Sequence, residues 1–368
     1  MTSLPCFRRS LLLAGFGALL LCFPHSPLRG AEVPAAAATV SVCPSCGGDC
    51  DTLTFDHPGI CPHCGMTLVP KGEKRAKTVA ILLFNGVQII DYAGPWEVFG
   101  EAGYTVFTVA ETAAPVKTVF GQSVNPTYTF ETAPKADILV VPGGDVGDAL
   151  CGDRTLIQWI QREAAGSGHV LSVCTGAFLM SKAGLLDGLT VTTYHGAIDQ
   201  LVAATPRAKV VRDQRFVDSG KIVVTAGLSS GIDGALHLVS VIDTLGAAQS
   251  VALNAEYNWQ PESGYARAAL PDRYFTFKHD DLKGRPLFRA GDRSHWKDVW
   301  QVEGQGSVAA FTAKSAQLLS AQAGWKKAGE GQWTFVGDDG RVWHASSAVA
   351  ADPAGDGSVV WTLELNGG

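Results

Sequence analysis

The chain has 368 residues, of which 46% are hydrophobic and only 17% are charged. Soluble domains carry about 25% charged residues on average, so the composition indicates an ordered globular protein and excludes a wholly disordered one. The formal net charge is −6 at pH 7. This negative net charge argues against non-specific electrostatic binding of DNA or RNA, which needs clustered lysine and arginine. We therefore expect no nucleic-acid partner.

Residues 1–31 have the layout of a cleaved export signal. A basic pair, Arg8 and Arg9, precedes an apolar run from Leu11 to Phe23, and small residues end the segment. An uncleaved membrane anchor is the alternative, but the apolar run has about 13 residues where a bilayer span needs roughly 20. We therefore predict an exported protein, periplasmic or extracellular, with no stable membrane span after cleavage. The arginine pair also resembles a twin-arginine signal, which serves proteins that fold before export.

Two Cys-x-x-Cys pairs follow the leader within residues 40–71. The first pair is Cys43 and Cys46, the second is Cys61 and Cys64, and 14 residues separate them. Four thiolates at this spacing are typical of a tetrahedral zinc site, so we predict a small structural zinc ribbon with these four residues as ligands. The alternatives are copper, or disulfides formed after export, although Cys-x-x-Cys pairs have poor geometry for disulfides. Cys50 is a spare donor nearby.

Residues 77–262 alternate short apolar runs with amphipathic segments. The apolar runs contain many β-branched residues, which is typical of strands buried on both faces of a parallel sheet. The predicted strands are 78–84, 104–109, 137–141, 169–173 and 221–225, and the predicted crossover helices include 156–165 and 197–204. The pattern predicts an open α/β sheet with flanking helices, whose ligands bind beyond the carboxyl ends of the strands.

Three of these strand ends carry residues that could take part in a chemical reaction. The strand 169–173 continues into Cys174 and a helix, which is the layout of a sharp turn that raises a side chain above the sheet. A helix N-terminus at this position predicts a lowered thiol pKa. The strand 137–141 ends in the glycines Gly143 and Gly144, and Asp91 follows the first strand in an otherwise apolar stretch. A buried cysteine is more often a small hydrophobic residue than a nucleophile, so the convergence of the three carries the prediction.

These motifs resemble the ThiJ/PfpI superfamily, which has a class I glutamine-amidotransferase-like fold. The matching segments occur in the same order as in the family and span about half of the chain: Leu83–Gly86, Asp91–Phe99, Val140–Gly144, Ser172–Ala177, Ala183–Gly188 and Thr225–Asp233. The resemblance is strongest to isonitrile hydratases and to the ligand domain of AraC-type regulators, and it implies a flavodoxin-like α/β fold. Residues 58–70 also resemble a heavy-metal-binding domain.

The resemblance implies roles for particular residues. Cys174 takes the place of the nucleophile, Asp91 is the acid that contacts it, and the amides of Gly144 and Thr175 form an oxyanion hole. Tyr194 occupies the place where many relatives have a histidine, with His195 one residue later as a catalytic candidate. The substrate-binding residues are then Gly143, Tyr194 and Asp233. Asp233 also lies at the start of a predicted helix, so a helix-capping role stays open. No cofactor is implied for this domain.

Residues 263–368 lie outside the resemblance and are rich in tryptophan. A helix is predicted over 315–322, a hairpin over 332–344 and a last strand over 358–365, which together predict a small α+β extension. Tryptophans on strands bind ligands such as glycans in some proteins, but a small domain more often fills its core with them. No helix-turn-helix with a basic recognition helix is visible, which separates this chain from the regulators.

Two functions from different classes follow. The first is an exported cysteine-dependent hydratase or hydrolase that acts on a small electrophilic substrate, such as an isonitrile, an amide or an aldehyde. The second is a ligand- or metal-sensing domain that has kept the turn at Cys174 but lost catalysis. Both take a small molecule as partner, and a homodimer stays open.

Overall fold

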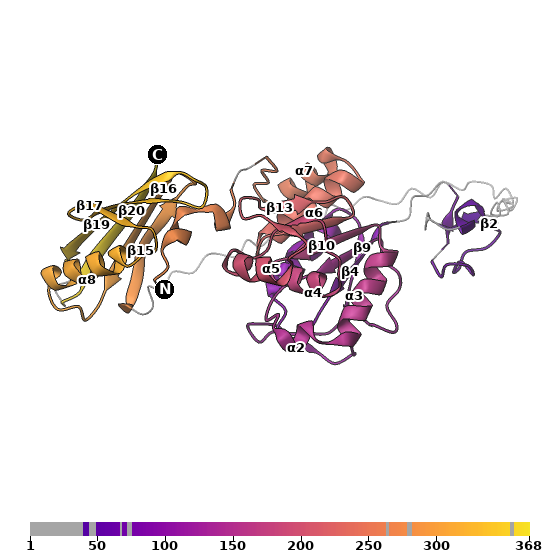
Figure 1. Cartoon of the computed structure of the whole chain (residues 1–368). Coiled ribbons are helices and arrows are strands. Elements are labelled where there is room, and N and C mark those ends of the chain that lie inside the picture. The colour runs from indigo at the N-terminus through magenta and orange to yellow at the C-terminus, as the bar shows by residue number, and fades with distance from the viewer. Residues whose placement is uncertain are drawn as a thin grey trace, which may run out of the picture.

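The computed structural model describes residues 40–43, 49–66, 68–71, 76–262, 265–277, 282–353 and 357–368 (Figure 1). The predicted export signal, residues 1–31, lies outside the described residues. Within the described ranges, no helix combines the length and the apolar character that a bilayer crossing needs.

The central domain is built on a seven-stranded sheet with the strand order β13-β14-β10-β9-β4-β5-β8. Its strands are β4 (Thr78–Leu82), β5 (Thr105–Ala110), β8 (Tyr128–Thr129), β9 (Ile138–Val141), β10 (His169–Val173), β13 (Phe216–Asp218) and β14 (Ile222–Thr225). All neighbours pair in parallel except β13, which runs antiparallel to β14. The central strands are buried on both faces, as continuous apolar runs require. The predicted open parallel α/β sheet of flavodoxin-like type is confirmed.

Helices cover both faces of this sheet. One layer contains α1 (Ile89–Glu101), α6 (Ser230–Ile242) and α7 (Leu245–Asn254), which pack against one another. The other elements are α2 (Asp148–Cys151), α3 (Arg154–Gly166), α4 (Gly176–Lys182), the 3₁₀ turn η2 (His195–Ala197) and α5 (Ile198–Ala204), with α4 in contact with α2, α3 and α5. Small ladders add β6 (Val116–Lys117) with β7 (Ser123–Val124), and β11 (Thr190–Val191) with β12 (Lys209–Val210).

The N-terminal segment forms a small three-stranded antiparallel sheet. Its strands are β1 (Ser41–Val42), β2 (Thr54–Phe55) and β3 (Val69–Pro70), and the 3₁₀ turn η1 spans Asp49–Thr52. Its buried residues are few and include three cysteines, Cys43, Cys50 and Cys61. Because so small an apolar core contributes little stability, a bound metal is the expected source of the rest.

The C-terminal extension is a six-stranded antiparallel sheet with one long helix. The strands are β15 (Gly284–Gly291), β16 (His295–Val302), β17 (Lys326–Gly329), β18 (Gln332–Val336), β19 (Val342–Ala351) and β20 (Val359–Gly367), and α8 spans Val308–Ser320. Alternate residues of β16 and β20 are buried, as expected for a sheet with one covered face. Six tryptophans fill this core: Trp296, Trp300, Trp325, Trp333, Trp343 and Trp361. The predicted α+β extension is confirmed, and its tryptophans are core residues.

The predicted helix 315–322 is displaced. The observed helix α8 begins at Val308 because the hydroxyl of Ser307 accepts a hydrogen bond from the amide of Ala310 at 3.1 Å and so caps the N-terminus.

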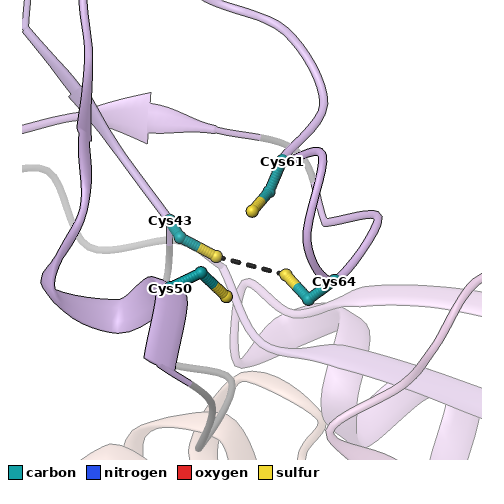
Figure 2. A group of neighbouring side chains, drawn as sticks. All are labelled: Cys43, Cys50, Cys61 and Cys64. Carbon is teal, nitrogen blue, oxygen red and sulfur yellow. Dashed lines mark hydrogen bonds between the residues drawn. The ribbon is translucent and has the colours of Figure 1, made fainter.

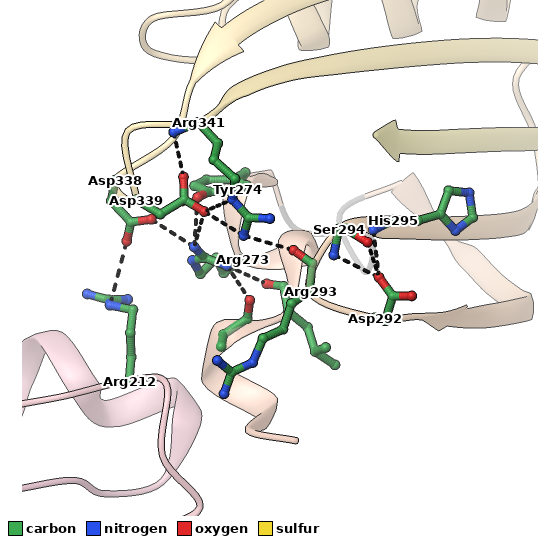
Figure 3. A network of polar contacts seen from close by, with 12 residues as sticks. Arg212, Arg273, Tyr274, Asp292, Arg293, Ser294, His295, Asp338, Asp339 and Arg341 are labelled. Carbon is green, nitrogen blue, oxygen red and sulfur yellow. Dashed lines mark hydrogen bonds and ion pairs between the residues drawn. The ribbon is translucent and has the colours of Figure 1, made fainter. Parts of the chain in front are cut away.

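Charged side chains join the extension to the α/β domain (Figure 3). Arg212 Nε lies 3.6 Å from Asp338 Oδ2, and the same aspartate pairs with Arg273 at 2.8 Å and accepts a hydrogen bond from the hydroxyl of Tyr274 at 2.8 Å. Arg293 also donates to the carbonyl of Asp213. The two short turns η3 (Arg267–Ala269) and η4 (Pro271–Tyr274) connect the domains, and η3 packs against η2.

Candidate active site and metal centre

Cys174 occupies a sharp turn between β10 and α4 at the carboxyl end of the sheet. Its φ is 58°, a left-handed conformation that is strained for a residue with a side chain. The surrounding structure holds this conformation at both backbone groups: the Cys174 amide donates to the carbonyl of Ala226 at 3.1 Å, and the Thr193 hydroxyl donates to the Cys174 carbonyl at 2.7 Å. Cys174 is 6% exposed and is therefore buried at this edge of the sheet.

Asp91 lies in the first turn of α1 and is fully buried beside this thiol. One carboxylate oxygen, Oδ2, accepts from the Gly143 amide at 3.2 Å, and no hydrogen-bond partner for Oδ1 exists among the described residues. Burial raises the pKa of Asp91 to about 7, against the opposite effect of the Cys174 thiol and the amides of Gly143 and Leu228. Near neutral pH this carboxyl therefore exists in both forms and is suited to give and take a proton.

The thiol itself differs from the sequence-based prediction. Burial first, and the nearby charge of Asp91 second, raise the pKa of Cys174 to about 12. The amide and hydroxyl of Thr175 act to lower it, but they are outweighed. The prediction of a lowered thiol pKa was wrong because it considered the helix terminus and neglected the cost of burying a charge. Before substrate binds, Cys174 is therefore a neutral thiol at neutral pH.

The predicted oxyanion hole is only half available. The Gly144 amide donates to the hydroxyl of Thr175 at 2.9 Å, and that hydroxyl donates back to the Gly144 carbonyl at 3.0 Å. The Gly144 amide is thus occupied by a hydrogen bond that holds the turn in place. The Gly143 amide is also occupied, because it donates to Asp91. The Thr175 amide, which acts on the sulfur of Cys174, is the remaining donor of the predicted pair for a developing negative charge.

The ring of Tyr194 and the sulfur of Cys174 lie on the same side of Gly227. A Cβ atom placed on Gly227 would lie 2.6 Å from Cδ2 of Tyr194 and 3.5 Å from Sγ of Cys174. The ring of His195 packs on Tyr194 with centroids 4.4 Å apart and lines a cleft with Arg267 and Asp272. Burial and Arg267 lower the pKa of His195. The catalytic role of His195 stays a prediction.

Asp233 is held by an ion pair at the start of α6. Its carboxylate is buried in the first turn of α6, pairs with Arg215 Nε at 2.5 Å and accepts from the hydroxyl of Tyr257 at 3.0 Å. Asp233 also lines a cleft with Arg215 and Tyr265, and its substrate-binding role stays a prediction. Arg215 was not predicted, since a single arginine before a short strand has no sequence signature of its own.

The N-terminal thiols form a compact cluster (Figure 2). The sulfur atoms of Cys43, Cys50, Cys61 and Cys64 all lie within 4.8 Å of one another, and Cys43 and Cys64 are 3.3 Å apart. This set fits a tetrahedral soft-metal site. Burial acts to raise the pKa of Cys64, but the Met66 amide and the neighbouring thiols lower it to about 7, which favours the thiolate that a metal binds.

Cys50 takes part in this cluster although the spacing pattern favoured Cys46. Cys46 lies outside the described residues. The turn η1 carries Cys50 inward among the other three sulfurs, and a pattern restricted to Cys-x-x-Cys pairs overlooks a donor from such a turn. No disulfide joins any two of the described cysteines.

The fold and the cysteine turn together define an α/β protein with a nucleophile elbow. Residues 77–240 match the DJ-1/PfpI family, and residues 42–71 match the heavy metal binding domain. The isonitrile hydratase of Pseudomonas putida is 36% identical over 186 residues, which cover 50% of this chain and 79% of that enzyme. The chain therefore belongs to the DJ-1/PfpI family and carries a heavy metal binding domain at its N-terminus.

Two further relatives illustrate the range of the family. The HTH-type transcriptional regulator GbdR of Pseudomonas aeruginosa strain UCBPP-PA14 is 24% identical over 178 residues, or 46% of this chain and 48% of the regulator. The crystal structure of a ThiJ/PfpI family protein from Pseudomonas syringae aligns with a TM-score of 0.47 and 28% identity over 55% of this chain and 85% of that protein.

Proposed function

We propose that this protein is an exported cysteine-dependent hydratase whose substrate is a small isonitrile. The observation that carries the proposal is the pairing of Cys174 with a fully buried carboxyl group, Asp91, whose Oδ1 has no partner among the described residues. Similarity to the isonitrile hydratase of Pseudomonas putida supports the choice of substrate. Export rests on the leader sequence, residues 1–31.

The first chemical step forms a thioimidate. An isonitrile carbon carries a lone pair, and Asp91 in its acid form protonates this carbon. The carbon then becomes electrophilic, and the sulfur of Cys174 attacks it as the thiol proton passes to Asp91, which is thereby restored. The product is R–N=CH–S–Cys174, which contains all atoms of the isonitrile and the thiol.

The second step consumes one water molecule. Water adds to the carbon of the thioimidate, one proton goes to nitrogen, and the resulting R–NH–CH(OH)–S–Cys174 collapses. The carbon–sulfur bond breaks, the sulfur recovers a proton through Asp91, and the N-substituted formamide R–NH–CHO leaves. The Thr175 amide, which acts on the sulfur, is the donor proposed to stabilise negative charge that develops on the added oxygen.

Cys174→Ala tests this proposal. Wild type is expected to convert an alkyl isonitrile to its formamide, and the variant is expected to lose at least about 10³-fold in turnover, because nucleophile removal costs several orders of magnitude. Formamide is measured by chromatography, with Cys151→Ala, which removes a thiol from α2, as the matched control. Equal background rates for wild type and Cys174→Ala would remove the case for a hydratase.

A sensing domain is the second candidate, and one observation favours it. The Gly144 amide is occupied by Thr175, so the site lacks the complete pair of donors that an efficient acyl-transfer enzyme presents. Similarity to the regulator GbdR agrees with a ligand-binding role. Saturable binding of an isonitrile or aldehyde without any turnover would support this candidate.

The N-terminal segment is proposed to hold one structural zinc ion. Cys50→Ser is expected to lower zinc content from about one per chain to near zero, because a structural zinc site uses four ligands. Elemental analysis of purified protein measures this, with Cys151→Ser as control. Full zinc content in Cys50→Ser, together with its loss in Cys46→Ser, would assign the fourth position to Cys46.

A further inference from the structure

One short turn touches both members of the Cys174–Asp91 pair. This turn, residues 226–229, joins β14 to α6. Its first residue, Ala226, accepts the hydrogen bond from the Cys174 amide at 3.1 Å. The next residue, Gly227, lies against Sγ of Cys174, and the amide of Leu228 acts on Asp91. Displacement of this turn would therefore change the surroundings of the sulfur and of the carboxyl together.

The turn adopts a conformation that needs support. Leu228 has a φ of 58°, which is uncommon for a residue with a branched side chain. A non-glycine residue in this region costs on the order of 1–3 kcal/mol in other proteins and persists only where surrounding contacts impose it. The contacts that impose it are expected within hydrogen-bond distance of the turn.

Arg215 supplies these contacts at both ends of the turn. Its backbone carbonyl accepts from the Ala226 amide at 2.9 Å, and its guanidinium donates to the Ser229 hydroxyl at 2.9 Å. The same guanidinium is fixed by the ion pair with Asp233 at 2.5 Å. The Ser229 hydroxyl makes no capping bond to α6 and instead accepts a hydrogen bond from Arg215.

The side chain of Arg215 is itself held in place by its neighbours. The side chains of Arg215 and Asp233 are only 19% and 7% exposed, and the Tyr257 hydroxyl donates to Asp233 at 3.0 Å. The ring of Tyr265, from the segment that leads to the C-terminal extension, lies 5.8 Å from the guanidinium carbon of Arg215. An arginine whose guanidinium bonds Asp233 and Ser229 and lies near an aromatic ring loses little further freedom when it fixes a neighbouring turn.

We propose that Arg215 is a positioning residue for the reactive pair: it holds the turn 226–229 in the conformation that presents Gly227 to the sulfur of Cys174 and the Leu228 amide to Asp91. The inference rests on the proposed function only in treating this pair as the reactive one. The competing explanation is an ion pair that stabilises the start of α6 and nothing else. The two explanations differ in what happens at Cys174.

The test uses variants that separate the anchor from the helix. Ser229→Ala removes the side-chain link between Arg215 and the turn but leaves the Arg215–Asp233 ion pair in place. Arg215→Lys retains a positive charge but cannot bond Ser229 and Asp233 with the same fork geometry. Ser250→Ala is the matched control, because Ser250 bonds only to its own helix at Gly246.

The readout is the rate of Cys174 alkylation by iodoacetamide across a pH series, resolved by mass spectrometry of peptides in the full-length protein. This measurement needs no substrate, so it stays informative if isonitrile turnover is never found. Cys174 is the titratable group that acts on Asp91 among the described residues. Ionisation of Asp91 is expected to change the alkylation rate of Cys174 in one step along the pH series. The pH of this step therefore reports the geometry of the pair.

In both Ser229→Ala and Arg215→Lys we expect this step to move upward by about half a pH unit or more, because moving the Leu228 amide away from the carboxylate favours its neutral form. Ser250→Ala is expected to match wild type. Thermal unfolding midpoints are measured alongside. A lower unfolding temperature in Ser229→Ala with an unchanged alkylation profile would overturn the proposal and leave the network as a helix anchor.

Discussion

Replacing Asp91 with asparagine is expected to make the folded protein more stable above pH 7 while abolishing its turnover. The carboxyl group is fully buried, and burial raises its pKa from 3.8 to about 7. Between these two pH values the folded protein binds more protons than the unfolded chain. The free energy of unfolding therefore falls as the pH rises through this window, and the cost of burying the charged carboxylate is reached in full only above it.

Asparagine has nearly the same shape and carries no charge at any pH. Each pH unit between the folded and unfolded pKa values corresponds to about 1.4 kcal/mol, so the variant is expected to gain on the order of 2–4 kcal/mol over wild type at pH 8 and little at pH 4. Its side-chain oxygen can still accept the hydrogen bond from the Gly143 amide, which is 3.2 Å from the carboxylate in the native protein.

In the proposed function, the same substitution removes the group that transfers protons to and from the isonitrile. Turnover of an isonitrile is expected to fall by about 10²–10⁴-fold, the usual contribution of a general acid or base. Urea denaturation at pH 4, 6 and 8 measures the stability, and formamide production measures the turnover. Asp148→Asn is the control, because Asp148 also lies in the first turn of a helix but is exposed.

Two outcomes would contradict this account of Asp91. A stability gain that is the same at every pH would mean that the carboxyl is not titrating in the buried pair. Turnover equal to wild type would mean that the proton travels by another route. The stability measurement reports the electrostatic cost of burying Asp91, and the turnover measurement reports its chemical role. A gain in stability together with a loss of turnover is the pattern expected when a protein retains a destabilising group for function.

The parallel sheet was predictable because its strands are buried on both faces. Continuous apolar runs such as 137–141 and 169–173 have few alternative structures when glycine or proline bounds them, and the observed strands β9 and β10 differ from them by at most one residue at an end. The position of Cys174 followed from the same reasoning, since it comes directly after one of these strands.

The C-terminal sheet was predicted only in part. The hairpin and last strand correspond to β18, β19 and β20, but β15, β16 and β17 were missed. Seven of the eight residues of β15 are exposed, so the strand has no buried face whose alternation would reveal it. In the site, the ion pair between Arg215 and Asp233 was beyond prediction for another reason: it depends on how the edge strand β13 packs beside α6.

The second large effect is expected for Gly176→Ala, at the first residue of α4. A Cβ atom here would lie 2.3 Å from the carbonyl oxygen of Val141 and 2.9 Å from that of Pro142. Both neighbours are backbone atoms, one in the last residue of β9 and one in the first residue of the loop that follows it, so no side chain can move aside. Relief requires α4 to shift away from the sheet, and with it the Thr175 amide and the strained backbone of Cys174.

Gly176→Ala is therefore expected to lose about 1–3 kcal/mol of stability or more, as overpacked cores do, and to lose most of its reactivity at Cys174. Gly166→Ala is the matched control: it also lies in a helix, α3, but its added methyl group would meet no atom within 4 Å. Since alanine is favoured over glycine in helices by about 1 kcal/mol, this control is expected to gain stability and keep wild-type alkylation. Opposite signs for two identical substitutions would locate the constraint in the contact between α4 and the β9 loop. A Gly176→Ala protein with wild-type stability and alkylation would show that the elbow tolerates displacement, and that the bonds to Ala226 and Thr193 are enough to hold Cys174.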